Sequence, residues 1–299
     1  MSKIKFTGIM PALLTPLDKD GKVIKSAVKD MVDYMIAANV DGFYAVGGTG
    51  EGVLLTLEQR KMMAQAAIEA AAGRAKVIVH TGAINCDEVM ELTRFATAAG
   101  ADGISSVPPS IYFPNSMDEV LRFYRSIAGN THLPILIYAN HTGAGINMNA
   151  LMSELLKIDN IAGAKDTRAN YFAMWQLKQL NNGDINIING PDESLLCGLS
   201  MGADGGIGCT YAAMPELYVD LYRNFKAGDF ARAQEIQNRI NKVIAAMGKF
   251  VEGNIIQTTK ELMRLKGFEP GAATFPAKEF TAEKRKAFGD AMEEAGFVR

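Results

Sequence analysis

The chain has 299 residues, of which 48% are hydrophobic and 21% are charged, a composition typical of folded globular proteins. Its 31 Lys and Arg residues nearly balance its 33 Asp and Glu residues, and no basic block stands out, so we expect no nucleic-acid partner. Gly, Pro or charged residues interrupt every apolar stretch, which argues against a membrane partner. The N-terminal segment lacks an apolar signal core, so we predict a cytoplasmic protein.

The cysteine and histidine positions do not form a metal-binding or disulfide pattern. The three cysteines are far apart and include no CxxC pair: Cys86, Cys197 and Cys209. The three histidines are equally scattered and form no HExxH motif: His80, His132 and His141. We therefore predict no metal site.

A repeated unit organises the chain. In three places a helical pattern ends in a small residue or Asn suited to a left-handed cap, followed by Asp-Gly and a short apolar run. These units begin at Ala38, Ala99 and Met201. Further apolar runs of strand length occur at residues 7–13, 76–80, 134–138, 161–164 and 185–188. Together they make eight candidate strands.

Segments with helical apolar spacing separate these strands, at residues 26–38, 57–72, 86–99, 117–127, 149–156, 169–180 and 193–201. Such alternation implies parallel strands, and eight units in this length fit a closed barrel better than an open doubly wound sheet. The absence of GxGxxG after an early strand also disfavours a dinucleotide-binding fold. We predict an α/β fold, a (β/α)8 TIM barrel over residues 1–226. A C-terminal helical extension packed on the barrel follows over residues 227–299, with helices at 229–249, 254–265 and 281–294.

Lys165 is the strongest candidate for chemistry, because a barrel's active site lies at the C-terminal ends of its strands. It follows the apolar run at 161–164. Full burial lowers a lysine pKa by roughly 3–5 units from about 10.4, which leaves neutral amine to attack a ketone. The alternative is a structural lysine paired with Asp166 or another carboxylate. Position alone does not separate the two.

Three other strand ends carry polar residues. Tyr138 ends the neighbouring strand, and its phenol could move protons, although a rim tyrosine with a satisfied hydroxyl is the alternative. The loop at residues 47–52 could hold an anion through backbone amides and the Thr49 hydroxyl, or could be only a tight turn. Asp192 and Glu193 follow strand seven, where the alternative is the acidic first turn of a helix.

Together these residues resemble the dihydrodipicolinate synthase / N-acetylneuraminate lyase family, over about residues 4–246. The segment Gly47-Gly48-Thr49-Gly50-Glu51 resembles the family's Gly-(Ser/Thr)-Thr-Gly-Glu. Tyr138 stands where the family has a proton-shuttling tyrosine, and Lys165 where it has the Schiff-base lysine. The resemblance implies a class I aldolase without a separate cofactor, in which Lys165 condenses with pyruvate or a related 2-keto acid. Its partners would be pyruvate and an aldehyde or sugar.

The resemblance also implies roles for further residues. Thr49 and the backbone amides of the Gly48–Thr49 turn would hold the substrate carboxylate. Tyr112 resembles an aromatic that family members lend to a neighbouring subunit's catalytic site, which implies a homotetramer built as a dimer of dimers. The substrate-binding positions of the lyases correspond to Thr167, Gly190, Asp192, Glu193, Ile207 and Cys209.

The lyase branch is favoured over the synthase branch. The synthases carry an Arg five residues after the tyrosine, and this chain has Gly143 there, so bidentate carboxylate recognition is lost at that position. The lyase pattern Gly-x-Asp-Glu is present from Gly190. We therefore expect cleavage of a sialic acid into an N-acylmannosamine and pyruvate.

Some positions depart from the lyase pattern. Gly48 replaces a hydroxyl residue, Cys209 replaces a Ser, and Ala139-Asn140-His141 replaces Asn-x-Pro. His141 fits a surface-loop residue better than a replacement proton relay. The remaining alternatives are an aldolase for 2-keto-3-deoxy sugar acids, 4-hydroxy-tetrahydrodipicolinate synthase, and a barrel that binds a keto acid or sugar without catalysis.

Overall fold

The computed structural model describes residues 2–3, 5–109, 115–139, 145–253, 255–272 and 274–297. Eight parallel strands form one sheet in the order β1-β8-β7-β6-β5-β4-β3-β2. Their bounds are β1 Gly8–Pro11, β2 Gly42–Ala45, β3 Lys76–His80, β4 Gly103–Ser106, β5 Ile135–Ala139, β6 Ile161–Asp166, β7 Asn186–Asn189 and β8 Gly205–Gly208. Backbone hydrogen bonds from Asp41 to Ile9 (2.8 Å) and from Leu13 to Tyr44 (2.9 Å) join β1 to β2 and close the barrel.

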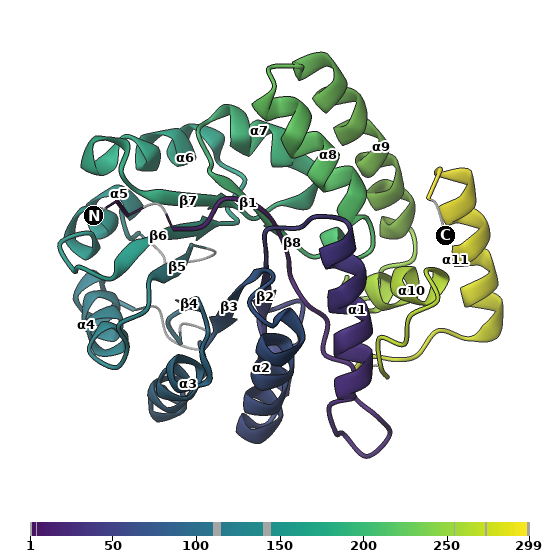
Figure 1. The fold of residues 1–299 in the computed structure, drawn as a ribbon, viewed down its shortest axis with the longest axis horizontal. Coiled ribbons are helices and arrows are strands. Elements are labelled where there is room, and N and C mark those ends of the chain that lie inside the picture. Colours follow the sequence, from purple (N-terminus) through teal and green to yellow (C-terminus); the bar gives the residue numbers. More distant parts are fainter. Residues whose placement is uncertain are drawn as a thin grey trace.

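Helices follow the strands and surround them (Figure 1). Their bounds are α1 Lys25–Ala37, α2 Leu57–Ala71, α3 Cys86–Ala99, α4 Met117–Ala128, α5 Met148–Leu155, α6 Tyr171–Lys178, α7 Leu195–Ser200 and α8 Pro215–Lys226. The predicted (β/α)8 barrel is confirmed. The helix predicted at 193–201 was too long, because Asp192–Ser194 form a 3-10 turn before α7 begins.

The repeated Asp-Gly unit has a structural cause. Each unit turns through a left-handed residue, at Asn39 (φ 66°), Gly100 (φ 90°) and Gly202 (φ 94°), as predicted. The aspartate that follows accepts a hydrogen bond from the backbone N–H at the start of the preceding strand, always at 2.8 Å: Asp41 from Ile9, Asp102 from Val77 and Asp204 from Ile187. The repeat therefore joins three pairs of neighbouring strands at the N-terminal end of the barrel.

An irregularity in β6 sets the orientation of Lys165. The register between β5 and β6 shifts after Ile135, so that Ala162 lies in the barrel interior and Lys165 pairs with Tyr138. Gly163 permits this, because a Cβ there would lie 1.9 Å from the backbone oxygen of Asn186. Lys165 is thus the fifth residue of β6, whereas the strand predicted from the sequence ends at residue 164.

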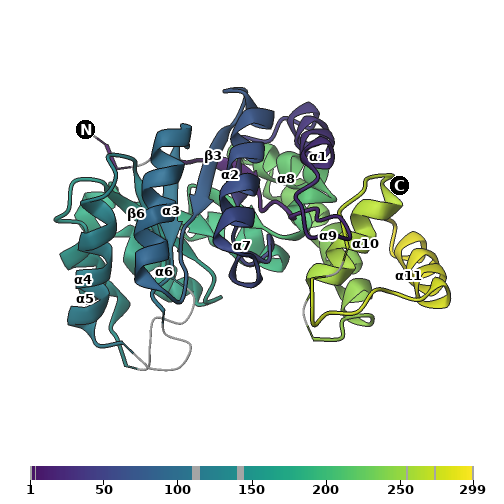
Figure 2. The same ribbon diagram turned by 90° about the horizontal axis from the view of Figure 1, so that it is seen from below.

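The C-terminal extension consists of α9 Phe230–Gly248, α10 Ile256–Leu265 and α11 Ala282–Glu294, which lie to one side of the barrel (Figure 2). Helix α9 packs against α8, and α11 packs against α9. In α10 every residue from Ile256 to Met263 is buried. The division of the chain at residues 226/227 remains a prediction about domain organisation. No helix within the described ranges combines the length and apolarity needed to cross a membrane.

Candidate active site

Lys165 is buried in the mouth of the barrel, with 7% of its surface exposed. Its ammonium nitrogen lies 4.4 Å from the ring centroid of Tyr44 and 4.8 Å from that of Tyr138. Within the described residues it forms no salt bridge. Asp166 is held instead by Arg168, at 2.9 Å from Nε and 2.6 Å from Nη2. The alternative in which Asp166 pairs with Lys165 is therefore wrong.

Burial lowers the pKa of Lys165 to about 8, while the negative charge of Asp192 opposes the shift. About a tenth of the amine is then neutral at pH 7, compared with well under a thousandth for an ordinary lysine. A neutral amine is the form that adds to a ketone. The position of Lys165 therefore suits it to nucleophilic attack.

Tyr138 lies beside Lys165 at the end of β5. Burial raises the pKa of its phenol, and the neighbouring Thr167 hydroxyl opposes that rise. Thr167 in turn lies against Gly190, where a Cβ would come within 2.2 Å of Thr167 Oγ1. A glycine at position 190 therefore allows the β6 and β7 ends to approach closely, which brings Tyr138, Lys165 and Thr167 together.

The loop at residues 47–52 is a tight turn in which two backbone amides have no acceptor among the described residues. Glu51 N donates to Gly48 O (2.9 Å), and Gly52 N donates to Gly47 O (3.0 Å). The amides of Gly48 and Thr49 donate no hydrogen bond to any described residue. Adjacent free amides are a common way to bind an anion. Gly48 itself is exposed, and a Cβ added there would meet no atom within 4 Å.

Asp192 joins the end of β7 to the end of β8. Its carboxylate accepts hydrogen bonds from Cys209 N (3.1 Å), Thr210 N (2.6 Å) and Thr210 Oγ1 (2.6 Å). Burial raises the pKa of Asp192, and these hydrogen bonds oppose the rise. Because a carboxylate has about four acceptor positions, about one remains for a ligand hydroxyl. Glu193 is exposed on the same 3-10 turn, so neither residue begins α7.

Two of the predicted substrate-binding residues, Cys209 and Ile207, lie at the end of β8. The Cys209 thiol lies 3.2 Å from Thr259 Oγ1, and burial raises its pKa to about 12, so it is protonated at neutral pH. The Thr49 hydroxyl and the charge of Lys165 partly oppose that rise, so the β2 loop, β6 and the β8 end come together near this thiol. Ile207 lies in the apolar interior cluster of the barrel.

Sequence reasoning missed three polar residues around Lys165. Tyr44 donates to Ser105 Oγ (3.0 Å). The His80 ring lies 6.0 Å from the Tyr44 ring and 6.1 Å from the Tyr138 ring. Burial, helped by the charges of Arg60 and Lys165, lowers the pKa of His80 to about 3, so the imidazole is neutral. The inward alternation along β2, β3 and β4 could have indicated all three.

The remaining expectations concern residues outside the described ranges or a bound metal. Tyr112, His141 and Gly143 lie outside the described residues. Among the residues that are described, no group of three or more His, Cys, Asp or Glu side chains could hold a metal ion. The residues that do converge supply an amine, a phenol, hydroxyls and free amides, which suits covalent chemistry on a keto acid.

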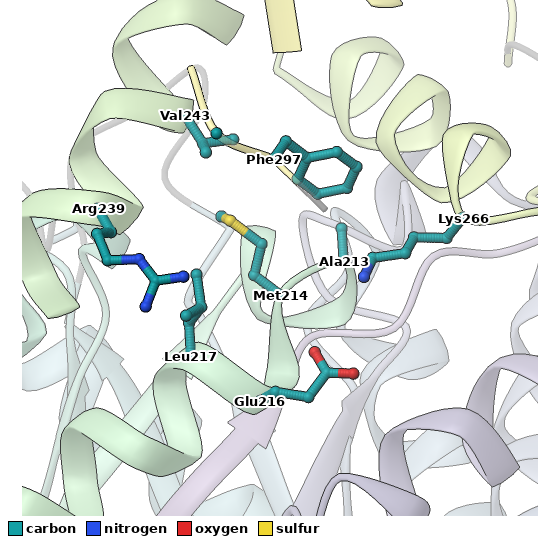
Figure 3. Close-up of a pocket in the computed structure, with 9 residues that line it drawn as sticks. Ala213, Met214, Glu216, Leu217, Arg239, Val243, Lys266 and Phe297 are labelled. Carbon is teal, nitrogen blue, oxygen red and sulfur yellow. The ribbon is translucent and has the colours of Figure 1, made fainter. Parts of the chain in front are cut away.

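A separate cavity of about 310 Å³ lies outside the barrel and contains none of the predicted site residues (Figure 3). Apolar side chains such as Met214, Leu217 and Phe297 line it. Two of its charged groups already have partners: Glu216 accepts a hydrogen bond from Tyr34 (3.2 Å), and the Lys266 ammonium lies 5.3 Å from the Phe297 ring centroid. The cavity therefore lies apart from the residues that surround Lys165.

Comparison with known proteins agrees with this geometry. Residues 5–295 match the model of the dihydrodipicolinate synthetase family. The chain belongs to this family. An N-acetylneuraminate lyase of Mediterraneibacter gnavus is 31% identical over 97% of this chain and 92% of its own length, and one of Rhizobium meliloti is 32% identical over 97% and 95%. The structure of a Ruminococcus gnavus sialic acid aldolase superposes with a TM-score of 0.90 at 30% identity, covering 98% of this chain and 99% of that one.

Proposed function

We propose that this family member is an N-acetylneuraminate lyase, which cleaves a sialic acid into N-acetylmannosamine and pyruvate through a Schiff base on Lys165. The observation that carries the proposal is the buried amine of Lys165 beside the Tyr138 phenol, in a barrel mouth where the amides of Gly48 and Thr49 donate to no described residue. The relatives named above support the choice of substrate, since they are lyases of N-acetylneuraminate.

The first steps attach the substrate. The neutral amine of Lys165 adds to the C2 ketone of the open-chain sugar acid, and loss of water from the carbinolamine leaves an iminium. The amides of Gly48 and Thr49, with the Thr49 hydroxyl, bind the carboxylate next to that carbon. This contact fixes the ketone over Lys165, so that addition becomes effectively intramolecular.

The next steps break the C3–C4 bond. Tyr138 first gives its proton to the hydroxyl that leaves the carbinolamine as water, and the resulting phenolate then takes the proton of the C4 hydroxyl. The C3–C4 bond electrons move into the iminium to give an enamine, and the aldehyde N-acetylmannosamine leaves. The enamine then takes a proton at C3, and water releases pyruvate and regenerates the amine. The hydroxyl groups of the sugar would contact the residues that follow β6, β7 and β8, namely Thr167, Gly190, Asp192, Glu193 and Cys209. Ile207 would contact the pyruvate portion.

The assembly and cellular location belong to the same proposal. We expect a homotetramer in which Tyr112 of one protomer completes the site of another. We also expect the enzyme to act in the cytoplasm. All three cysteines are free, and Cys86 and Cys197 are exposed, which fits a reducing compartment.

A substrate screen tests the proposal. The protein is incubated separately with N-acetylneuraminate, with 2-keto-3-deoxy sugar acids, and with pyruvate plus aspartate semialdehyde, and pyruvate release or consumption is followed. We expect pyruvate release from N-acetylneuraminate. Release only from the smaller acids, or consumption of pyruvate only with the semialdehyde, would assign the chain to another branch of the family.

A further inference from the structure

A buried ion pair connects the C-terminal extension to the substrate-binding turn. Lys260 Nζ on α10 lies 2.6 Å from Glu51 Oε2, and their side chains are 0% and 1% exposed. Lys260 also donates to the backbone oxygen of Ala272 at 2.6 Å. Neither oxygen of the Glu51 carboxylate accepts a hydrogen bond from a described residue, so Lys260 meets it as an ion pair. An apolar pair of similar size often stabilises a fold as well as a buried ion pair does, so the geometry that this pair imposes is the property to explain.

The backbone of Glu51 contacts one peptide in the turn. Its backbone N–H donates to Gly48 O at 2.9 Å. The Gly48 carbonyl and the Thr49 N–H belong to the same planar peptide, so the bond that holds the carbonyl also sets the direction of the N–H. Glu51 itself has a left-handed backbone (φ 55°), which a non-glycine residue adopts only when its surroundings require it. The ion pair with Lys260 supplies such a requirement.

A second contact of α10 reaches the other side of the same space. Thr259, the residue before Lys260, lies 3.2 Å from the Cys209 thiol at the end of β8. Consecutive residues of one buried helix therefore touch both the β2 loop and the β8 end. Figure 1 shows α10 between the barrel and α11, close to the chain that enters α1.

We propose that α10 is part of the substrate-binding apparatus, with Lys260 as a positioning residue that acts through Glu51 on the Gly48–Thr49 peptide. The inference rests on the proposed function, because it assigns that peptide to the carboxylate of the keto acid. It predicts that disturbing Lys260 weakens pyruvate binding without removing the Lys165 chemistry.

The test uses pyruvate and borohydride on the full-length chain. The pyruvate concentration that gives half-maximal trapping on Lys165 is measured for the wild type, Lys260→Met, Glu51→Gln, and the apolar double variant Glu51→Leu/Lys260→Met. Lys242→Met, at an exposed position of α9, is the matched control. Thermal unfolding of each variant is recorded alongside.

We expect the half-maximal concentration to rise about tenfold in Lys260→Met and in the double variant, since small misplacements of a binding group have effects of this size or larger. The maximal extent of trapping is retained, and Lys242→Met behaves as wild type. The double variant regains the thermal stability lost in Lys260→Met, because no charge is left buried alone. If Lys260→Met does not fold, the double variant and Glu51→Gln give the same readout.

The outcomes separate the two proposals. An unchanged half-maximal concentration in the folded double variant and in Glu51→Gln would show that the pair only stabilises the fold, and would overturn the inference alone. A wild type that forms no adduct at any pyruvate concentration would overturn the proposed function, and the inference with it.

Discussion

The side chains that face the barrel interior on β3 and β5 include an apolar residue, which we call the floor, and a polar residue nearer the C-terminal end of the strand, which we call the mouth. Floor and mouth residues stand two positions apart: Ile78 and His80 on β3, and Leu136 and Tyr138 on β5. On β6 the corresponding pair is Ala162 and Lys165, three apart because of the irregularity at Gly163. All six are largely or fully buried, yet only the mouth residues carry groups that water would solvate. Burial of the apolar floor residues therefore stabilises the fold. Burial of the mouth residues changes their proton affinity, and it lowers the pKa of Lys165 and of His80.

Lys165→Met gives the largest expected effect. Activity should fall by about 10⁴-fold or more, since the nucleophile is lost. Stability at pH 7 should rise, because the folded-state pKa of Lys165 lies below its unfolded value, so the charged form costs free energy below pH 8. Sialic acid cleavage and thermal melting measure the two changes. A large loss of stability would contradict the view that burying the Lys165 ammonium destabilises the folded state.

Tyr138→Phe should leave the fold intact and lower kcat by about 10²–10⁴-fold, the range for losing a positioned acid or base. Trapping of pyruvate on Lys165 should be affected less than cleavage. The comparison of kcat with adduct formation under single-turnover conditions checks this. Equal losses in both would assign Tyr138 to attachment and not to bond cleavage.

Leu136→Ala is the matched change on the floor of the same strand. Its side chain is fully buried, so we expect a loss of about 2–5 kcal/mol in the free energy of unfolding. Activity per folded molecule should stay close to wild type. Urea unfolding, together with kcat at low denaturant, measures both. A loss of activity without a loss of stability would show that the floor residue Leu136 contributes to catalysis and not to the fold.

The pH profile follows from the pKa of Lys165, lowered to about 8. The rate of adduct formation should rise about tenfold per pH unit below pH 8 and level off above it, as neutral amine accumulates. Asp192 raises that pKa, so Asp192→Asn should move the midpoint to lower pH. A midpoint near 10.5 in the wild type would mean that burial does not act on this amine.

Gly48→Ser has the smallest expected effect, and that effect is an increase in activity. A Cβ at Gly48 meets no atom within 4 Å, so the side chain fits without strain. It would return the hydroxyl that the family carries there, and a few-fold rise in kcat is expected, since one added hydrogen bond contributes about 1 kcal/mol. Gly48→Ala is the control and should show no rise. Equal activity in all three would show that this chain does not need a hydroxyl at position 48.

Much of the fold could be predicted from local patterns. The Asp-Gly units mark helix ends and strand starts, because their left-handed turns and carboxylate hydrogen bonds are encoded in adjacent residues. Lys165 and Tyr138 could be found because a barrel collects its chemistry at the strand ends. The pair between Glu51 and Lys260 could not be predicted, since it joins residues about 200 positions apart and local patterns say nothing about contacts over that separation. The irregularity in β6 could not be predicted either, because it depends on the close approach of the Asn186 backbone to Gly163.

The most direct test is borohydride reduction with pyruvate at pH 7 and pH 8, followed by mass spectrometry of the peptide that contains Lys165. The account predicts a reduced pyruvate adduct on Lys165 alone, formed faster at pH 8, and absent from Lys165→Met. No adduct on Lys165 at either pH, or an adduct on a different lysine, would contradict it.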